Sequence, residues 1–180
     1  MPGESNLVFY KDLAIFVTVT TNKDSNGKVG SYNTILQAID LKDYSIKWKR
    51  NDLFNWDHYY IYEDKLYIPI NKGKGASDII WCLNPETGET IWEKKLKLKV
   101  DESLRQIAFY KNMVLVSSDD AKIYFLNKDT GKIVRERQFL YKDRENVSAQ
   151  WVEDGVTTIM YMSVSGDIVV FLHLAYGYIA

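Results

Sequence analysis

Short runs of mixed apolar and polar residues follow one another along almost the whole chain, in the pattern typical of β-strands. Small polar residues, glycine and proline separate these runs, as between Asn84 and Gly88. Asn84 can bond the backbone of such a turn, Pro85 fixes φ, and Gly88 can adopt the positive φ that closes it. Helical spacing of apolar residues is absent throughout. The pattern therefore predicts an all-β fold of short antiparallel strands.

The strand, turn and strand around residues 82–92 recur along the chain. When the copies are aligned, the positions that close the turn are Tyr44, Gly88, Gly131 and Gly177. Successive positions lie 44, 43 and 46 residues apart. A period in the low forties, with four short strands in each copy, is typical of a β-propeller blade.

The repeat predicts a β-propeller of about four four-stranded antiparallel blades, the last of them incomplete. The blades are expected at residues 7–49, 58–95, 106–138 and 149–180, so that residues 1–180 form one propeller domain or part of one. Few residues precede the first strand or follow the last turn, so we expect no overlap of chain ends to close a ring. We interpret the chain as a fragment, as half of a dimeric ring, or as a stack of sheets whose open edges meet a partner.

Residues near each turn follow the pattern A-x-D-x-x-T-G-x-x-x-W. This pattern resembles the tryptophan-docking repeat of the PQQ-like propellers, a family that includes quinoprotein alcohol dehydrogenases and the propeller lipoprotein of bacterial outer-membrane assembly. The residues that carry the resemblance are Ala38, Asp40, Trp48, Asn84, Thr87, Gly88, Trp92, Asn127, Thr130, Gly131 and Gly177. The third blade has Arg135 in place of the tryptophan. The resemblance implies that Trp48 and Trp92 pack between blades.

Composition and charge exclude several kinds of partner and site. Lys and Arg number 23 against 24 Asp and Glu, so we expect no binding of nucleic acid. No window approaches about 18 uninterrupted apolar residues, so no membrane span is predicted. Cys82 is the only cysteine, which excludes an internal disulfide and a cysteine-rich metal cluster. The N-terminus reads as that of a cytoplasmic protein, or of a periplasmic or extracellular one after removal of a signal peptide.

Loop length suggests where a binding site would lie. Tight turns are expected between strands one and two and between strands three and four, whereas longer loops such as 21–33 lie at the other strand ends. Binding residues concentrate on long loops carried by a rigid scaffold. Within this loop, Asn22, Asp24 and Asn26 space oxygen ligands as in a calcium loop, but the usual first Asp and the bidentate Glu are missing. A plain polar loop is the alternative.

A second candidate is an aromatic cluster at the entry to the second blade. Its residues are Trp56, Asp57, His58 and Tyr59, and they could form a contact surface for a partner. Packing in the core or at the rim is the alternative. Two local features complete the predictions. His173 is interpreted as a degenerate turn position, and Pro69 is expected to sit in a β-bulge because it cannot donate to a ladder.

No catalytic arrangement of side chains is recognisable, and no cofactor or firm metal site is predicted. The sequence therefore favours a non-catalytic β-propeller scaffold that binds protein through its long-loop face or an open blade edge. The partner would be another protein or a second copy, as in a homodimer that completes a ring. Two alternatives remain open: a fragment of a PQQ-like enzyme acting on alcohols or sugars, and a bacterial immunity or inhibitor protein that binds a toxin.

Overall fold

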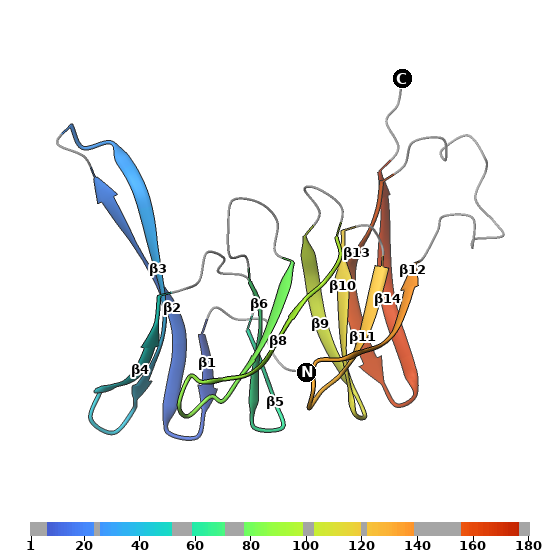
Figure 1. The fold of residues 1–180 in the computed structure, drawn as a ribbon, viewed down its shortest axis with the longest axis horizontal. Helices are drawn as coiled ribbons and strands as arrows, with labels where there is room; N and C mark the ends of the chain where they lie inside the picture. The colour runs from blue at the N-terminus through green and yellow to red at the C-terminus, as the bar shows by residue number, and fades with distance from the viewer. Residues whose placement is uncertain are drawn as a thin grey trace. The chain divides into compact units, whose positions relative to one another are not determined.

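The computed structural model is composed of β-strands joined by turns (Figure 1). It describes residues 7–23, 26–51, 59–70, 78–98, 103–119, 122–138 and 156–176, with the backbone alone at 22–23, 29–33, 156–161 and 169–176. These residues contain no helix. The predicted all-β fold is confirmed.

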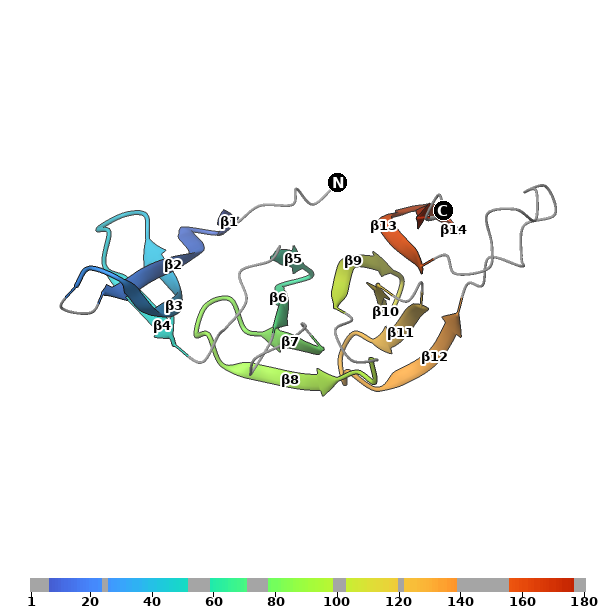
Figure 2. The ribbon, with the colours of Figure 1, turned by 90° about the horizontal axis from the view of Figure 1, so that it is seen from above.

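The chain divides into two compact units, of which residues 1–96 form the first. This unit holds two four-stranded antiparallel sheets, each a blade with its strands in chain order. The first blade consists of β1 (Leu7–Tyr10), β2 (Leu13–Lys23), β3 (Val29–Asp40) and β4 (Ile46–Arg50). The second consists of β5 (Tyr60–Tyr62), β6 (Lys65–Ile70), β7 (Ile79–Leu83) and β8 (Thr90–Lys95). Figure 2 shows β1 and β5 on one side of this unit and β4 and β8 on the other.

Residues 97–180 form the second unit, with one four-stranded sheet and one hairpin. The sheet, or third blade, consists of β9 (Leu104–Tyr110), β10 (Met113–Ser118), β11 (Lys122–Asn127) and β12 (Ile133–Gln138). The hairpin consists of β13 (Val156–Ser165) and β14 (Ile168–Tyr176). β13 lies beside β9, the first strand of the third blade (Figures 1 and 2).

The turn between strands three and four has the same bonds in all three complete blades. Its closing residue has a positive φ, and its amide donates to the carbonyl at the start of the turn, at 2.8 to 2.9 Å. The closing residues are Tyr44 (φ 59°), Gly88 (φ 72°) and Gly131 (φ 66°). The side chain at the start of each turn accepts from the amide two residues later, through Asp40, Asn84 and Asn127. The predicted spacings of 44 and 43 residues between the first three turns are therefore present in the backbone.

The turn between strands one and two also repeats, and it identifies the hairpin in the second unit. The positive-φ positions are Lys11, Glu63, Lys111 and Gly166, so the turn at Gly166 is the fourth copy. β13 and β14 are thus strands one and two of the fourth blade. The alignment of Gly177 with the residues that close the turn between strands three and four would make them strands two and three, and that assignment is wrong. His173 pairs with Ile159 inside β14 and does not lie in a turn, because the strand continues to Tyr176. Gly177 lies outside the described residues.

Two further predictions of local structure are wrong. The long loop expected at 21–33 is mostly strand, because Thr20 pairs with Asn33 and Thr21 with Tyr32 in a hairpin that extends beyond the rest of its sheet (Figure 1). Pro69 pairs with Ile80 in unbroken register, without a bulge. Neighbouring residues of an antiparallel strand donate to opposite sides, and the described pairing with β5 ends at Tyr67, so the β6–β7 ladder tolerates this proline.

Each unit has an apolar core between its two sheets. We call the face that packs on the next blade along the chain the front face, and the opposite face the back face. In the first unit, Leu13, Ile15 and Leu36 of the front face pack on the second blade. In the second unit, Leu115 and Ile123 of the front face pack with Met162 of the hairpin. The two cores are built from equivalent positions.

Candidate functional site

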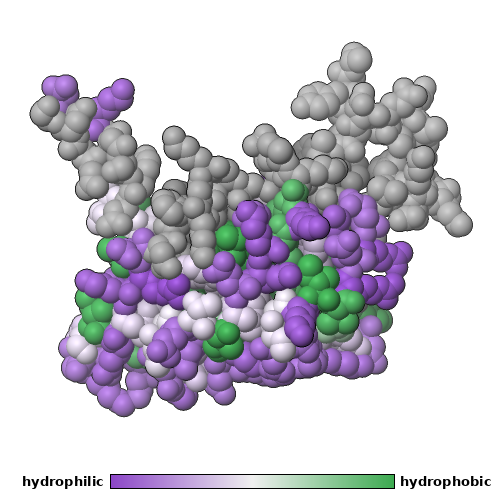
Figure 3. All heavy atoms as spheres, viewed as in Figure 1, coloured by the Kyte–Doolittle hydropathy of each residue, from purple (hydrophilic) through white to green (hydrophobic). Residues whose placement is uncertain are grey.

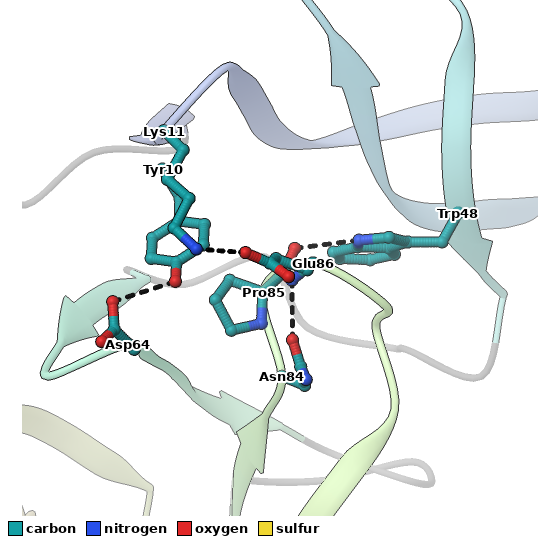
Figure 4. A network of polar contacts seen from close by, with 7 residues as sticks. All are labelled: Tyr10, Lys11, Trp48, Asp64, Asn84, Pro85 and Glu86. Carbon is teal, nitrogen blue, oxygen red and sulfur yellow. Dashed lines mark hydrogen bonds and ion pairs between the residues drawn. The ribbon is translucent and has the colours of Figure 1, made fainter.

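The junction of the first and second blades is built around Trp48. Its indole is buried, and Nε1 donates to the carbonyl of Pro85 at 3.0 Å (Figure 4). The ring lies against the turn that closes at Gly88, where a Cβ atom would meet Trp48 Cε3 at 2.6 Å. Gly88 is therefore required both by its positive φ and by the space that the indole occupies. This contact is the docking that the resemblance implied for Trp48.

Polar contacts join the edges of the same junction (Figure 4). The Tyr10 hydroxyl donates to Asp64 Oδ1 at 2.9 Å, and Lys11 forms an ion pair with Glu86. Burial raises the pKa of Tyr10, and the bond to Asp64 adds to this rise. The hydrogen bond to Glu86 raises the pKa of Lys11. At neutral pH, Tyr10 therefore keeps its proton and donates, and Lys11 stays charged.

Arg50 extends the junction beyond Trp48. Its Nη1 donates to the Gly88 carbonyl at 3.0 Å and to Thr90 Oγ1 at 2.8 Å. Its guanidinium lies over the Trp81 ring, 3.9 Å from the centroid. Such cation–π stacking stabilises by roughly 0.5–2 kcal/mol. Arg50 of the first blade therefore binds three residues of the second blade, and its role is structural.

The second unit repeats the polar contacts of this junction. The Tyr110 hydroxyl donates to Asp167 Oδ1 at 2.5 Å, as Tyr10 does to Asp64, and Lys111 forms an ion pair with Asp167 at 2.9 Å. The hydrogen bonds from Tyr110 and then Lys111 lower the pKa of Asp167. The matching bond supports the assignment of the hairpin as the inner half of a fourth blade.

The back face of the first blade differs from that of the second in being exposed. The back face of the second blade includes Tyr59, Leu66, Ile68, Ile70, Ile79, Trp81 and Leu83, all buried. The equivalent residues of the first blade are Leu7, Ala14, Phe16, Thr18, Ile35, Gln37 and Ile39, with Phe9 beside them on β1. Leu7 and Phe9 are 41% and 63% exposed. Hydrophobic residues are visible over the first sheet, at the left of Figure 3. Ala14 is buried and the remaining residues of this face are half-buried, so the first blade presents a partly exposed sheet face on which Leu7 and Phe9 are the most exposed residues.

The structure places only some of the residues predicted as site candidates. Tyr59 is fully buried in the first core, so it does not belong to an exposed contact surface. Trp56, Asp57 and His58 lie outside the described residues. Trp92 is buried, with its ring centroid 5.9 Å from that of Tyr67.

The calcium candidate is divided between a strand and a turn. Asn22 lies in β2 and pairs with Ser31, and Asn26 lies in the turn that follows. Asp24 is outside the described residues, so the ligand set stays a prediction. Among the described residues, no group of three His, Cys, Asp or Glu side chains is arranged to hold a metal ion. The same residues include no helix long and apolar enough to cross a membrane.

Comparison with known proteins identifies the family. The family model described as outer membrane protein assembly factor BamB matches residues 31–175, which is most of the chain. The chain belongs to this PQQ-like propeller family. This agrees with the resemblance carried by the tryptophan-docking turns.

Individual relatives are distant. Quinoprotein alcohol dehydrogenase PedH of Pseudomonas putida KT2440 is 30% identical over 82 residues, which cover 42% of this chain and 14% of PedH. A europium-containing methanol dehydrogenase is 17% identical, with a TM-score of 0.54 over 77% of this chain and 25% of that one. The computationally designed Ika4 protein is 11% identical, with a TM-score of 0.55 over 98% of this chain and 91% of its own. The two structures are evidence of the fold alone, and the chain spans a quarter or less of the two dehydrogenases.

We predict that Gly88→Ala destabilises the protein far more than Gly27→Ala. Both glycines have a positive φ, which costs an L residue about 1–2 kcal/mol, but a Cβ atom at Gly27 meets nothing within 4 Å. At Gly88 the Cβ atom also displaces the buried Trp48 ring, at a further cost of about 1–3 kcal/mol. Urea unfolding followed by tryptophan fluorescence measures the difference. Equal losses in the two variants would show that the indole does not depend on this turn.

We also predict that Asp167 contributes stability that disappears in acid. Because the folded-state pKa of Asp167 is lowered, its contribution is present above the ordinary pKa and is lost as the pH falls through the folded-state value. Between about pH 6 and pH 3, the free energy of unfolding should therefore fall less in Asp167→Asn than in the wild type. Tyr110→Phe removes the main cause of the lowered pKa but keeps the bond to Lys111, so its pH dependence should lie between those of the wild type and Asp167→Asn. Identical pH dependence in all three proteins would contradict the account.

Proposed function

We propose that this chain is a non-catalytic propeller scaffold that binds protein through the back face of its first blade. The observation that carries the proposal is the exposure of Leu7 and Phe9. Phe9 is 63% exposed, whereas the second blade buries the equivalent face against its neighbour. An apolar sheet face that the fold covers in one blade and leaves open in another is typical of a surface that a partner covers.

The composition of this face suits a protein partner. Phe9 stands at its exposed edge, Phe16, Ile35 and Ile39 are half-buried at its centre, and Lys49 is exposed at its rim. Protein interfaces combine an aromatic and aliphatic centre with a polar rim in this way. The long-loop face is the other surface that the sequence favours, but most of its loops lie outside the described residues.

The family supports the scaffold and suggests where it acts. The family description is that of an outer membrane protein assembly factor, which favours a role in assembly. We therefore place this chain outside the bacterial cytoplasm, as the sequence allowed for a protein whose signal peptide had been removed. Its described acidic side chains at the blade junctions, Asp64, Glu86 and Asp167, are paired with structural partners.

The second candidate function is that of a piece of a quinoprotein dehydrogenase. The similarity to PedH over 82 residues favours it. PedH is named as an alcohol dehydrogenase, but the similarity covers only 14% of it. Under the scaffold proposal, the purified protein neither retains added pyrroloquinoline quinone through gel filtration nor oxidises primary alcohols in a dye-linked assay. Quinone absorbance that co-elutes with the protein, together with alcohol oxidation, would establish the enzyme instead.

Binding through the back face can be tested with matched surface variants. We expect chemical cross-linking in bacterial extract to join the wild-type protein to a discrete partner or to itself. Phe9→Ser should lose this product, because a hydroxyl replaces the most exposed aromatic side chain of the face. Val134→Ser, at an equally exposed position on β12 of the second unit, should keep it. A product that survives in Phe9→Ser would place the binding surface elsewhere.

A further inference from the structure

The joint between the third blade and the fourth-blade hairpin contains two methionine side chains. Met162 of β13 is buried in the apolar core of the second unit. Met113 of β10 is half-buried and packs against the same core. The chain has four methionines, so half of them lie at this one joint.

The corresponding joint of the first unit uses other side chains at these positions. When the blades are aligned on the turn between strands one and two, Leu13 corresponds to Met113 and Tyr59 to Met162. Leu13 and Tyr59 are buried in the core of the first unit. The joint can therefore be built without methionine, and the two sulfur atoms distinguish the second joint from the first.

The thioether of methionine reacts with mild oxidants such as hydrogen peroxide. The sulfur takes one oxygen atom from the peroxide, which is reduced to water, and methionine becomes methionine sulfoxide. The new oxygen is a hydrogen-bond acceptor, but Leu115 and Ile123, which pack with Met162, have no side-chain donor. Burying a polar group without a hydrogen bond is unfavourable, so oxidation should favour an open joint.

Polar contacts at the joint depend on the same docking. The amide of Met162 donates to Oε1 of the buried Gln106 at 2.6 Å, so this bond requires the backbone of β13 to stay in place. Asp167, in the hairpin turn, is bound by Tyr110 and Lys111 of the third blade. Displacement of the hairpin would therefore break these bonds together with the apolar contacts.

We propose that this joint is an oxidation-sensitive switch. Met113 is half-buried and Met162 is only 7% exposed, so peroxide oxidises Met113 first. The sulfoxide then releases the hairpin, which exposes Met162 to a second oxidation and uncovers Leu115 and Ile123 of the third blade. Methionine sulfoxide reductases reverse both steps, so the hairpin docks again after reduction. The switch lies in the second unit and does not depend on the proposed binding through the first blade.

Peroxide treatment, followed by peptide mass mapping and hydrogen–deuterium exchange, tests the switch. We expect Met113 to gain an oxygen atom before Met162 does. Amide exchange in β13 and β14 should then rise about tenfold, the effect of one buried polar group without a partner, while exchange in the first blade stays unchanged. Treatment with methionine sulfoxide reductases should restore the slow exchange.

Leucine variants supply matched controls, because leucine occupies the Met113 position in the first blade. Met113→Leu should slow the oxidation of Met162 and keep the hairpin protected. Met113→Leu combined with Met162→Leu should not respond to peroxide, whereas Met160→Leu should respond like the wild type. Circular dichroism confirms folding, and Met113→Ile replaces Met113→Leu if that variant does not fold.

Several results would overturn the inference. One is a Met113 that resists peroxide at concentrations that oxidise methionine in a free peptide. Others are oxidation of Met162 before Met113, and oxidation of both residues with unchanged exchange in the hairpin. A response that persists in the double leucine variant, or that is lost in Met160→Leu, would also overturn it.

Discussion

The docking of Trp48 on the Pro85 to Gly88 turn is the contact on which the junction of the first two blades depends. The indole donates to Pro85, and Gly88 leaves room for the ring because it has no side chain. Each partner constrains the other, since the turn needs a positive φ and the ring needs the missing Cβ. Packing between the blades therefore explains the motif residues of this stretch. A functional surface is expected outside this joint.

Function then depends on which faces of the sheets stay exposed after the blades have stacked. Within each unit, the front face of one blade packs on the back face of the next. The first blade has an exposed back face, and the fourth-blade hairpin has an exposed front face. Arg135 replaces the docking tryptophan in the third blade, and its strand β12 is exposed along its whole length. Apolar side chains are exposed on the back face of the first blade, at Leu7 and Phe9, and also on other surfaces, at Ile46, Val134 and Ile168.

Much of the fold could be predicted from the sequence because the turns are local. Asp40, Asn84 and Asn127 each bond their own turn, so the repeat is visible without any tertiary information. The register of the fourth blade is the exception, because Gly177 resembles the glycines that close the turn between strands three and four, whereas the described turn at Gly166 joins strands one and two. Lys11-Asp12, Glu63-Asp64, Lys111-Asn112 and Gly166-Asp167 are copies of one turn, and the last of them places β13 and β14 correctly. The exposed back face could not be predicted, because the first and second blades have similar apolar patterns and only packing distinguishes them.

The central claim is that the Trp48 indole joins the first two blades by docking on the turn that closes at Gly88. Gly88→Ala made in the wild type and in a Trp48→Leu background tests this claim directly, because the added Cβ atom meets the indole at 2.6 Å. Without the indole, Gly88→Ala should cost about 1–3 kcal/mol less in the free energy of urea unfolding than it costs in the wild type. Equal costs in the two backgrounds would contradict the account.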